Sequence, residues 1–296
     1  MTALASGTTD RNQFASLDWT LFLAVGTIWG ASFLLIALGL RSFHPGLITW
    51  ARVGLGAGAL YCFPSARRRI DPADRRRLIA LSILWVGIPF TLFPLAEQHI
   101  NSAVTGLLNG ATPIFSGIIG GLFFNRVPRG PQRAGIAIGF VGIALVSLGS
   151  SRQGTTAVWG VVMVLGATLC YGVATNLAAA IQQRYGSIPV MAKMLGLATI
   201  WTTPFGIYGL AHSSWSPTSG AATAVLGVVG TGIAFALMAE LVGRVGGPRA
   251  SIITYLIPVI SLTLGILFLQ DRVTPIALIG VGLVLCGAVF ISRRER

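Results

Sequence analysis

Gly87-Ile88-Pro89-Phe90 returns 145 residues later, counting from 87 to 232, as Gly232-Ile233-Ala234-Phe235. The same offset relates further positions, most of which carry glycine or proline, the residues that set backbone geometry. These positions are Pro113, Ser116, Gly120, Leu122, Phe123, Gly135, Gly142 and Ser147, which match Pro258, Ser261, Gly265, Leu267, Phe268, Gly280, Gly287 and Ser292. Because no gap is needed, we interpret the second half of the chain as a repeat of the first.

The apolar residues of the chain occur in stretches of helix length. Hydrophobic residues make up 54% of the 296 residues and charged residues 10%, with a mean hydropathy of +0.78. This composition excludes an ordinary soluble domain. Each stretch has about 18–24 residues, enough to cross a hydrocarbon layer of ~30 Å. We expect transmembrane helices at 19–40, 45–63, 78–97, 102–124, 132–149, 157–180, 188–208, 221–242, 250–270 and 275–292.

The number of helices per repeat sets the fold class. Five spans are an odd number, so the second copy must enter the membrane in the opposite orientation to the first. Inverted repeats of this kind are typical of secondary transporters. The sequence predicts an all-α integral membrane protein, with ten transmembrane helices as two inverted five-helix repeats around a central cavity. Repeat one is expected at 19–149 and repeat two at 157–292, with cytoplasmic tails at 1–18 and 293–296.

Arginine is unequally distributed between the two faces that alternating loops define. Three arginines lie opposite the N-terminus, namely Arg41, Arg152 and Arg272. Sixteen lie on the side of the N-terminus: Arg11, Arg67, Arg68, Arg69, Arg75, Arg76, Arg77, Arg126, Arg129, Arg133, Arg184, Arg244, Arg249, Arg293, Arg294 and Arg296. This asymmetry places both termini in the cytoplasm. We therefore attribute the net charge of +13 to membrane topology and to contact with lipid head groups, and expect no nucleic acid partner.

Motifs for enzymatic chemistry are missing from the sequence. There is no phosphate-binding loop, and the sole lysine, Lys193, lies inside an expected span. The three histidines are scattered, and no spacing fits a metal site. We expect no enzyme activity, no cofactor and no metal. The expected partners are a small-molecule substrate and membrane lipid, with the chain a monomer or a weak homodimer.

Ionisable residues at membrane depth are costly and are therefore functional candidates. Arg52 and Lys193 lie in the second and seventh spans, where each side chain can also reach a nearby interface. Glu240 is expected to be better buried than Glu97 and is our candidate for proton coupling. Proton exchange requires a carboxylate or a histidine that meets both faces in turn, for which Glu240, Glu97 and Asp271 are the candidates, whereas facilitated diffusion requires none. From the sequence we favour weak or absent coupling.

Polar and aromatic residues deep in the spans are the candidates for substrate binding. They are Trp29, Phe33, Phe90, Asn109, Thr112, Tyr171, Thr175, Asn176, Thr254 and Tyr255. Hydrogen bonding between helices is the alternative role for the polar members, since an amide facing lipid is costly. Pro113 and Pro258 are repeat-related and should bend the fourth and ninth spans, either as hinges or for shape alone.

Several short motifs resemble one family of transporters. Ile28-Trp29-Gly30-Ala31-Ser32-Phe33 is similar to the first-helix signature of the EamA type within the drug/metabolite transporter superfamily. Ala51-Arg52 resembles that family's arginine in its second helix. Leu256-Ile257-Pro258-Val259, with Gly265, Leu269-Gln270-Asp271, Gly280 and Gly287, resembles the ninth and tenth helices, although the family usually carries Glu where Asp271 stands. The resemblance covers essentially the whole chain.

The resemblance implies a bundle of two inverted five-helix repeats that exports small metabolites across the bacterial inner (cell) membrane. Within this family the chain resembles the YddG type, which exports aromatic and other neutral amino acids. We therefore expect export of such amino acids by alternating access. The alternatives are another metabolite or drug, such as a nucleobase, a sugar-like or a lipophilic compound. A passive channel or a membrane protein without transport fits the sequence less well.

The arginine asymmetry makes a first testable prediction. A reporter that is active only in the periplasm, fused after Arg296, should stay inactive, because the C-terminus faces the cytoplasm. The same reporter inserted in the 212–216 connection should be active. The reverse pattern would contradict the orientation and, with it, the inverted repeat.

Overall fold

The structure is a computed structural model that describes residues 15–123, 130–151 and 155–292. These residues form helices and contain no strand. The longer helices are α1 (Ser16–Leu40), α2 (Pro45–Tyr61), α3 (Arg75–Leu81), α4 (Ile88–Ala96), α5 (Ser102–Asn109), α6 (Thr112–Phe123), α7 (Pro131–Ser151), α8 (Thr155–Tyr185), α9 (Ser187–Ala211), α10 (Pro217–Gly227), α11 (Ala234–Val245), α13 (Leu256–Leu269) and α14 (Pro275–Ser292). The shorter ones are η1 (Pro64–Arg67), η2 (Pro72–Asp74), η3 (Ser82–Gly87), η4 (Val228–Ile233), α12 (Gly247–Ala250) and η5 (Ser251–Tyr255).

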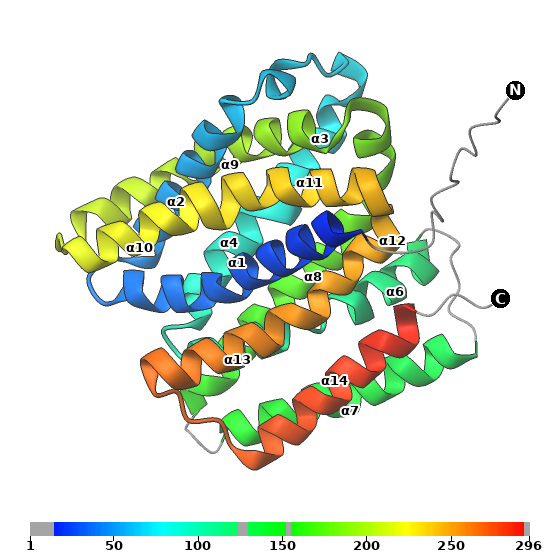
Figure 1. Cartoon of the computed structure of the whole chain (residues 1–296). Coiled ribbons are helices and arrows are strands. Elements are labelled where there is room, and N and C mark those ends of the chain that lie inside the picture. Colours follow the sequence, from blue (N-terminus) through cyan, green and yellow to red (C-terminus); the bar gives the residue numbers. More distant parts are fainter. Residues whose placement is uncertain (1–14, 124–129, 152–154, 293–296) are drawn as a thin grey trace, which may run out of the picture.

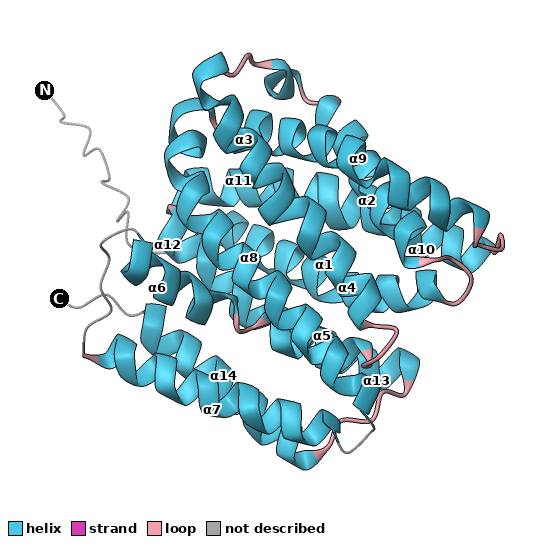
Figure 2. Ribbon diagram, turned by 180° about the vertical axis from the view of Figure 1, so that it is seen from behind, coloured by secondary structure: helices cyan, strands magenta, loops and turns pink. Residues whose placement is uncertain are grey.

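The helices run side by side in one bundle (Figure 1). α7 and α14 pack along one edge, and α2 and α9 pack together on the other side (Figures 1 and 2). α1 and α8 lie between these pairs (Figure 2). The first turn of α1 and the last turn of α14 are at the same end of the bundle (Figure 1), so the described chain crosses it an even number of times.

The outside of the bundle is apolar, and much of its polar content is inside. Leu122, Phe123 and Trp215 are 70%, 73% and 79% exposed, whereas Thr49 and Thr231 are fully buried. Seven of the described helical segments are long and apolar enough to cross a membrane, and two further apolar stretches, Pro131–Val146 and Pro275–Phe290, are shorter. An apolar exterior with polar groups directed inward is what a lipid solvent requires. The chain is therefore a multi-pass membrane protein.

The third and eighth expected spans are not regular α-helices. The third passes through α3, η3 and α4, and the eighth passes through α10, η4 and α11. In each, the middle element is a π-helix of 6 residues that reaches the repeated Gly-Ile-x-Phe motif. With the offset of 145, η3 maps onto 227–232, one residue from η4. π-turns are rare and are frequent at functional sites. Because one occurs at the equivalent place in both halves, we regard the third and eighth spans as candidates to line a functional site.

The fourth and ninth expected spans are interrupted as well. α5 and α6 are separated at Gly110 and Ala111, and the ninth span begins as the 3₁₀-helix η5 before α13 starts at Leu256. Pro113 and Pro258 follow these interruptions and explain them, because proline lacks an N–H and its ring crowds the preceding turn. The interruptions lie side by side, since a Cβ added to Gly110 would be 3.1 Å from Cγ of Pro258.

Contacts between helices follow the same pattern in the two halves of the chain. α1 packs against α13, α10 and α11, and α8 packs against α6 and α4. α2 packs on η4, and α9 packs on η3. Exchanging each helix for its repeat counterpart therefore turns one set of contacts into the other.

Glycine lets α7 and α14 approach closely. A Cβ added to Gly142 would overlap the carbonyl oxygen of Gly280, and one added to Gly287 would overlap that of Gly135. These two contacts are repeat counterparts, because 135 and 142 map onto 280 and 287. Small residues allow such backbone approach in lipid, where packing rather than hydrophobic exclusion holds helices together.

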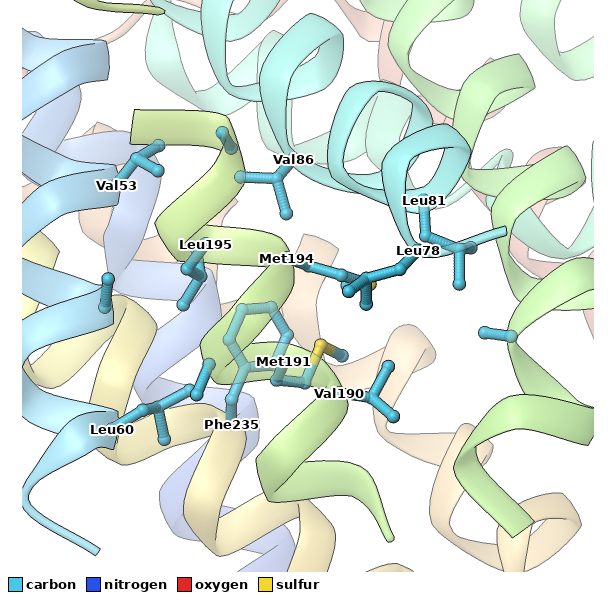
Figure 3. Packing of buried hydrophobic residues seen from close by; sticks show 14 of the residues in the cluster. Val53, Leu60, Leu78, Leu81, Val86, Val190, Met191, Met194, Leu195 and Phe235 are labelled. Atoms are coloured by element: carbon cyan, nitrogen blue, oxygen red, sulfur yellow. The ribbon is translucent and has the colours of Figure 1, made fainter. Parts of the chain in front are cut away.

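An apolar cluster fixes α2 and α9 to the rest of the bundle (Figure 3). Leu60 of α2, Leu81 of α3 and Met194 and Leu195 of α9 are fully buried in it. Phe235 of α11 joins them and is 7% exposed. Because these side chains come from four elements, the cluster anchors the π-helical third and eighth spans on both sides.

The close approach of α7 and α14 can be tested by adding volume at its centre. Gly142→Val should lower the free energy of unfolding by about 1–3 kcal/mol, as overpacking a tight contact does. Thermal unfolding of the purified protein in detergent measures the effect. Gly282→Val is the matched control, since nothing lies within 4 Å of a Cβ added there. Equal stability of the two variants would contradict the contact.

Candidate functional site

Aromatic rings from four helices meet near the centre of the bundle. Trp29 of α1 lies edge-to-face on Phe235 of α11, with ring centres 5.7 Å apart. Phe33, also of α1, lies edge-to-face on Phe93 of α4 at 5.5 Å. Tyr171 of α8 lies 5.9 Å from Phe93. The structure thus brings together Trp29, Phe33 and Tyr171 of the expected site and adds Phe93 and Phe235, which we name together the aromatic centre.

Arg52 of α2 is buried beside the aromatic centre and is 5% exposed. Its Nε–H donates to Oγ1 of Thr231 at 3.0 Å. Its guanidinium carbon lies 3.8 Å from the centre of the Phe90 ring, a cation–π contact. Phe90 was an expected site residue, and the structure places it directly under this charge.

The guanidinium of Arg52 makes no ion pair with an acid among the described residues. No carboxylate of the described ion pairs reaches it, and its two terminal nitrogens make no hydrogen bond in this part of the chain. A charged arginine at membrane depth costs about 2.5–3.5 kcal/mol when placed in a lipid-spanning helix. The arrangement therefore favours binding of an anionic group at the two free nitrogens.

Small residues bring α2 close enough to η4 for this contact. A Cβ added to Gly56 would lie 2.7 Å from Cγ2 of Thr231, and one added to Gly227 would lie 3.2 Å from the carbonyl oxygen of Arg52. The Thr231 hydroxyl donates to the carbonyl of Leu226, five residues earlier, at 3.0 Å. With its proton used there, the hydroxyl oxygen is an acceptor for Arg52.

The carbonyl of Phe90 is satisfied by a side chain rather than by its own helix. Pro94, four residues later, has no N–H to donate to it. Oγ1 of Thr49 in α2 donates instead at 2.9 Å, in a fully buried contact. This bond fixes α2 against α4 three residues from Arg52 and so positions both Phe90 and the guanidinium.

Asn109 and Thr112 lie at the interruption between α5 and α6. The Thr112 hydroxyl donates to the Asn109 carbonyl at 2.8 Å, which again replaces the N–H that Pro113 lacks. The side-chain oxygen Oδ1 of Asn109 is buried without a hydrogen-bond partner in the described chain. Asn109 is therefore the expected polar residue whose side chain keeps a free acceptor.

Thr175 and Asn176 of α8 hold α8 to α6. Oγ1 of Thr175 lies 3.0 Å from Oγ of Ser116, and the Asn176 amide donates to the Ser116 carbonyl at 3.1 Å. The same amide donates to the Gly172 carbonyl at 2.8 Å. These contacts correspond to the interhelical role that the sequence left open.

Thr254 and Tyr255 contact other parts of the bundle. The Thr254 hydroxyl donates to the Ser251 carbonyl within its own turn at 2.8 Å. The Tyr255 hydroxyl donates to the Ala288 carbonyl of α14 at 2.6 Å. The Thr254 hydroxyl thus stabilises the first turn of the ninth span, and the Tyr255 hydroxyl joins that span to α14.

The acidic residues differ from expectation in their burial. The Glu240 side chain is 61% exposed and lies 3.9 Å from Arg244, so the expectation that it is the better buried acid is wrong. It faces an open groove of about 280 Å³ that Arg68 and Tyr185 also line. Both carboxylate oxygens of Glu97, in contrast, are buried without a hydrogen-bond partner in the described chain. Glu240 is exposed because it lies on the face of α11 that lines this open groove.

Phe93, Phe235, Thr49 and Thr231 are the residues of this site that the sequence did not single out. Phe235 is the repeat counterpart of Phe90, so the Gly-Ile-x-Phe motif was a signal for it. Thr49 was signalled only by a proline on another helix, which no local pattern reveals.

A buried arginine beside an aromatic centre, with interrupted helices around both, is an arrangement typical of membrane transporters. The model of the EamA-like transporter family matches the chain twice, over residues 19–148 and 158–293. The chain therefore belongs to the EamA-like transporter family, which confirms the resemblance found in the sequence.

Similar proteins include transporters from several microorganisms. An "Uncharacterized transporter" of Archaeoglobus fulgidus is 24% identical over 277 residues, covering 94% of this chain and 99% of the relative. A "Probable terminal-alkyne amino-acid exporter" of Streptantibioticus cattleyicolor is 25% identical over 282 residues, 93% of each chain. A "Probable amino-acid metabolite efflux pump" of Escherichia coli is 25% identical over 280 residues, covering 91% and 93%. A solved crystal structure with 19% identity covers 93% of this chain and 97% of its own, with a TM-score of 0.62, and shows the same fold.

The bond between Thr49 and Phe90 makes a testable prediction. Thr49→Val should cost about 1–3 kcal/mol of unfolding free energy, because it leaves a buried carbonyl without a donor. In a Pro94→Ala background the same change should cost less, since the N–H of the new alanine can donate to Phe90. Thermal unfolding of the four proteins in this cycle measures the difference.

Thr263→Val is the matched control, because its hydroxyl bonds within its own helix at an exposed site. A cost of Thr49→Val that is unchanged in the Pro94→Ala background would contradict the proposed replacement of one donor by the other.

Proposed function

We propose that this protein is a secondary transporter that exports neutral amino acids, aromatic ones above all, by alternating access. The observation that carries the proposal is the buried guanidinium of Arg52, which has two free nitrogens and lies over Phe90. The family membership supports transport of a small molecule, and two of the relatives bear names of amino-acid exporters.

The chemistry of the site matches that of an aromatic amino acid. Its carboxylate can accept two hydrogen bonds from a guanidinium in the planar arrangement that arginine favours. Its side chain can stack on Trp29 and Tyr171, which contact both neighbouring apolar clusters. The free Oδ1 of Asn109 is an acceptor that suits an ammonium group.

We also propose that the chain has ten spans in two inverted repeats, 19–149 and 157–292. Both termini face the cytoplasm, and the protein lies in a bacterial inner membrane. The double match of the family model and the exchange of equivalent contacts between the halves support this arrangement. In this orientation Arg52 lies about two turns from the outer face, at 1.5 Å per residue.

Alternating access requires elements that bend near the site. The adjoining interruptions before Pro113 and Pro258 supply such elements, and η3 and η4 supply a second pair beside Phe90 and Phe235. We propose that these four segments absorb the movement, because irregular turns change conformation at lower cost than continuous helix.

Counterflow in proteoliposomes tests the proposal. Vesicles loaded with unlabelled amino acid should take up labelled aromatic amino acids with saturation and competition. Arg52→Gln should raise the half-saturating concentration about 10- to 100-fold, because a hydrogen bond to a charged group contributes roughly 1.5–3 kcal/mol. Amines that lack the carboxylate should compete poorly with the labelled amino acid for wild-type transporter. Their competition should be unchanged by Arg52→Gln.

Lys193→Gln is the charge-matched control, since its ammonium donates to the Ala66 carbonyl at 3.3 Å, away from the aromatic centre. Unchanged saturation in Arg52→Gln would contradict the role of this residue. Exchange of nucleobases, sugars or lipophilic compounds without exchange of amino acids would favour another substrate, and linear flux without competition would indicate a channel.

A further inference from the structure

Three acids lie near the expected outer and inner ends of the spans, and their surroundings differ. Asp271 accepts from Oγ of Ser102 at 2.8 Å and from the N–H of Ala103 at 2.9 Å. Its carboxylate therefore caps the first turn of α5, where two donors already satisfy it. Glu240 is exposed and lies near Arg244, so it stays solvated.

Glu97 has neither water-exposed oxygens nor a donor. It follows the last residue of α4, and both its carboxylate oxygens are buried without a hydrogen-bond partner among the described residues. Burying an ionised carboxylate without donors costs far more than burying a neutral acid, so such a group takes up a proton whenever it is occluded. The next residues, Gln98 and His99, are exposed, which places Glu97 a short distance from the outer solution.

The charges that face Glu97 come from two other elements. They are Asp271, in the connection between α13 and α14, and Arg52 of α2. Glu97 is therefore electrostatically linked to the guanidinium that we propose binds the substrate. Its ionised form attracts the ammonium group of an amino acid, whereas its protonated form does not. Proton binding and substrate binding thus oppose each other, which is the requirement for exchange.

We propose that Glu97 is the proton-binding site of the transporter and couples export to the entry of one proton. Facing outward, Glu97 binds a proton from solution as the amino acid leaves. Facing inward, it releases that proton to the cytoplasm and the next substrate binds. This inference rests on the proposed function, and it replaces the weak or absent coupling that the sequence favours.

The coupling is tested in proteoliposomes with and without a pH gradient. Wild type should accumulate labelled amino acid inside the vesicles against its gradient when the vesicle interior is the more acidic side, because one proton leaves as each amino acid enters. Glu97→Gln should lose this accumulation and keep counterflow at equal pH, with weaker substrate affinity, because Arg52 still binds the carboxylate of the substrate whereas the amide at position 97 cannot exchange a proton. Glu97→Asp should restore part of the accumulation, and Gln98→Ala, the neighbouring exposed residue, should behave as wild type.

Three results would overturn the proposal: accumulation that survives in Glu97→Gln, accumulation lost instead in Glu240→Gln, or loss of counterflow together with accumulation in a folded Glu97→Gln. The last result would make Glu97 a substrate contact rather than a proton site.

A second measurement does not depend on the substrate. Dicyclohexylcarbodiimide reacts with protonated carboxyl groups in apolar surroundings, and mass spectrometry of the labelled protein identifies the site. Glu97 should be labelled in preference to Asp271 and Glu240, with labelling that declines as pH rises. Absence of labelling at Glu97 would refute the proton site even if amino acids are not the substrates, whereas labelling without amino-acid exchange would refute only the proposed function.

Discussion

In a hydrocarbon solvent every backbone carbonyl needs a donor, and this constraint shapes the centre of the protein. Proline removes a donor wherever it occurs inside a span, and a side chain has to replace it. Thr49 donates to the carbonyl that Pro94 leaves free, and Thr112 donates to the one that Pro113 leaves free. Because each replacement joins or reshapes helices, the prolines determine where the spans bend and which faces meet.

The site depends on the same constraint. The bond from Thr49 to the Phe90 carbonyl holds α2 against α4, and the glycines facing η4 hold α2 against the eighth span. Arg52 is thereby fixed between Phe90 and Thr231 with its two terminal nitrogens left over. A buried charge that the fold positions without an ion pair is the group to which we assign substrate binding, because an anion would offset the cost of its burial.

The sequence predicted the helical membrane fold and the family, because apolar length and the glycine and proline repeat are carried by local patterns. It also identified Trp29, Phe33, Phe90 and Tyr171, which the structure brings to one place with Arg52. It did not reveal the π-helices η3 and η4, whose hydrogen bonds depend on packing by α9 and α2 rather than on composition. The burial of Glu240 and Glu97 was misjudged for a similar reason: distance from the end of a span does not tell which face a side chain takes.

The two halves of the chain share their helix interruptions but not their charged residues. With the offset of 145, Pro94 maps onto Ala239 and Thr49 onto Met194, so the second repeat lacks both the proline and the threonine that replaces its donor. Arg52 likewise maps onto Leu197, and Glu97 onto Val242. Hinges are therefore present in both halves, whereas the charged groups of the site come from repeat one alone. Two equivalent halves around a neutral centre would bind substrate equally well from either side. In the orientation that we propose, a single arginine and a single free acid lie near the outer face, so the two directions of transport are not equivalent.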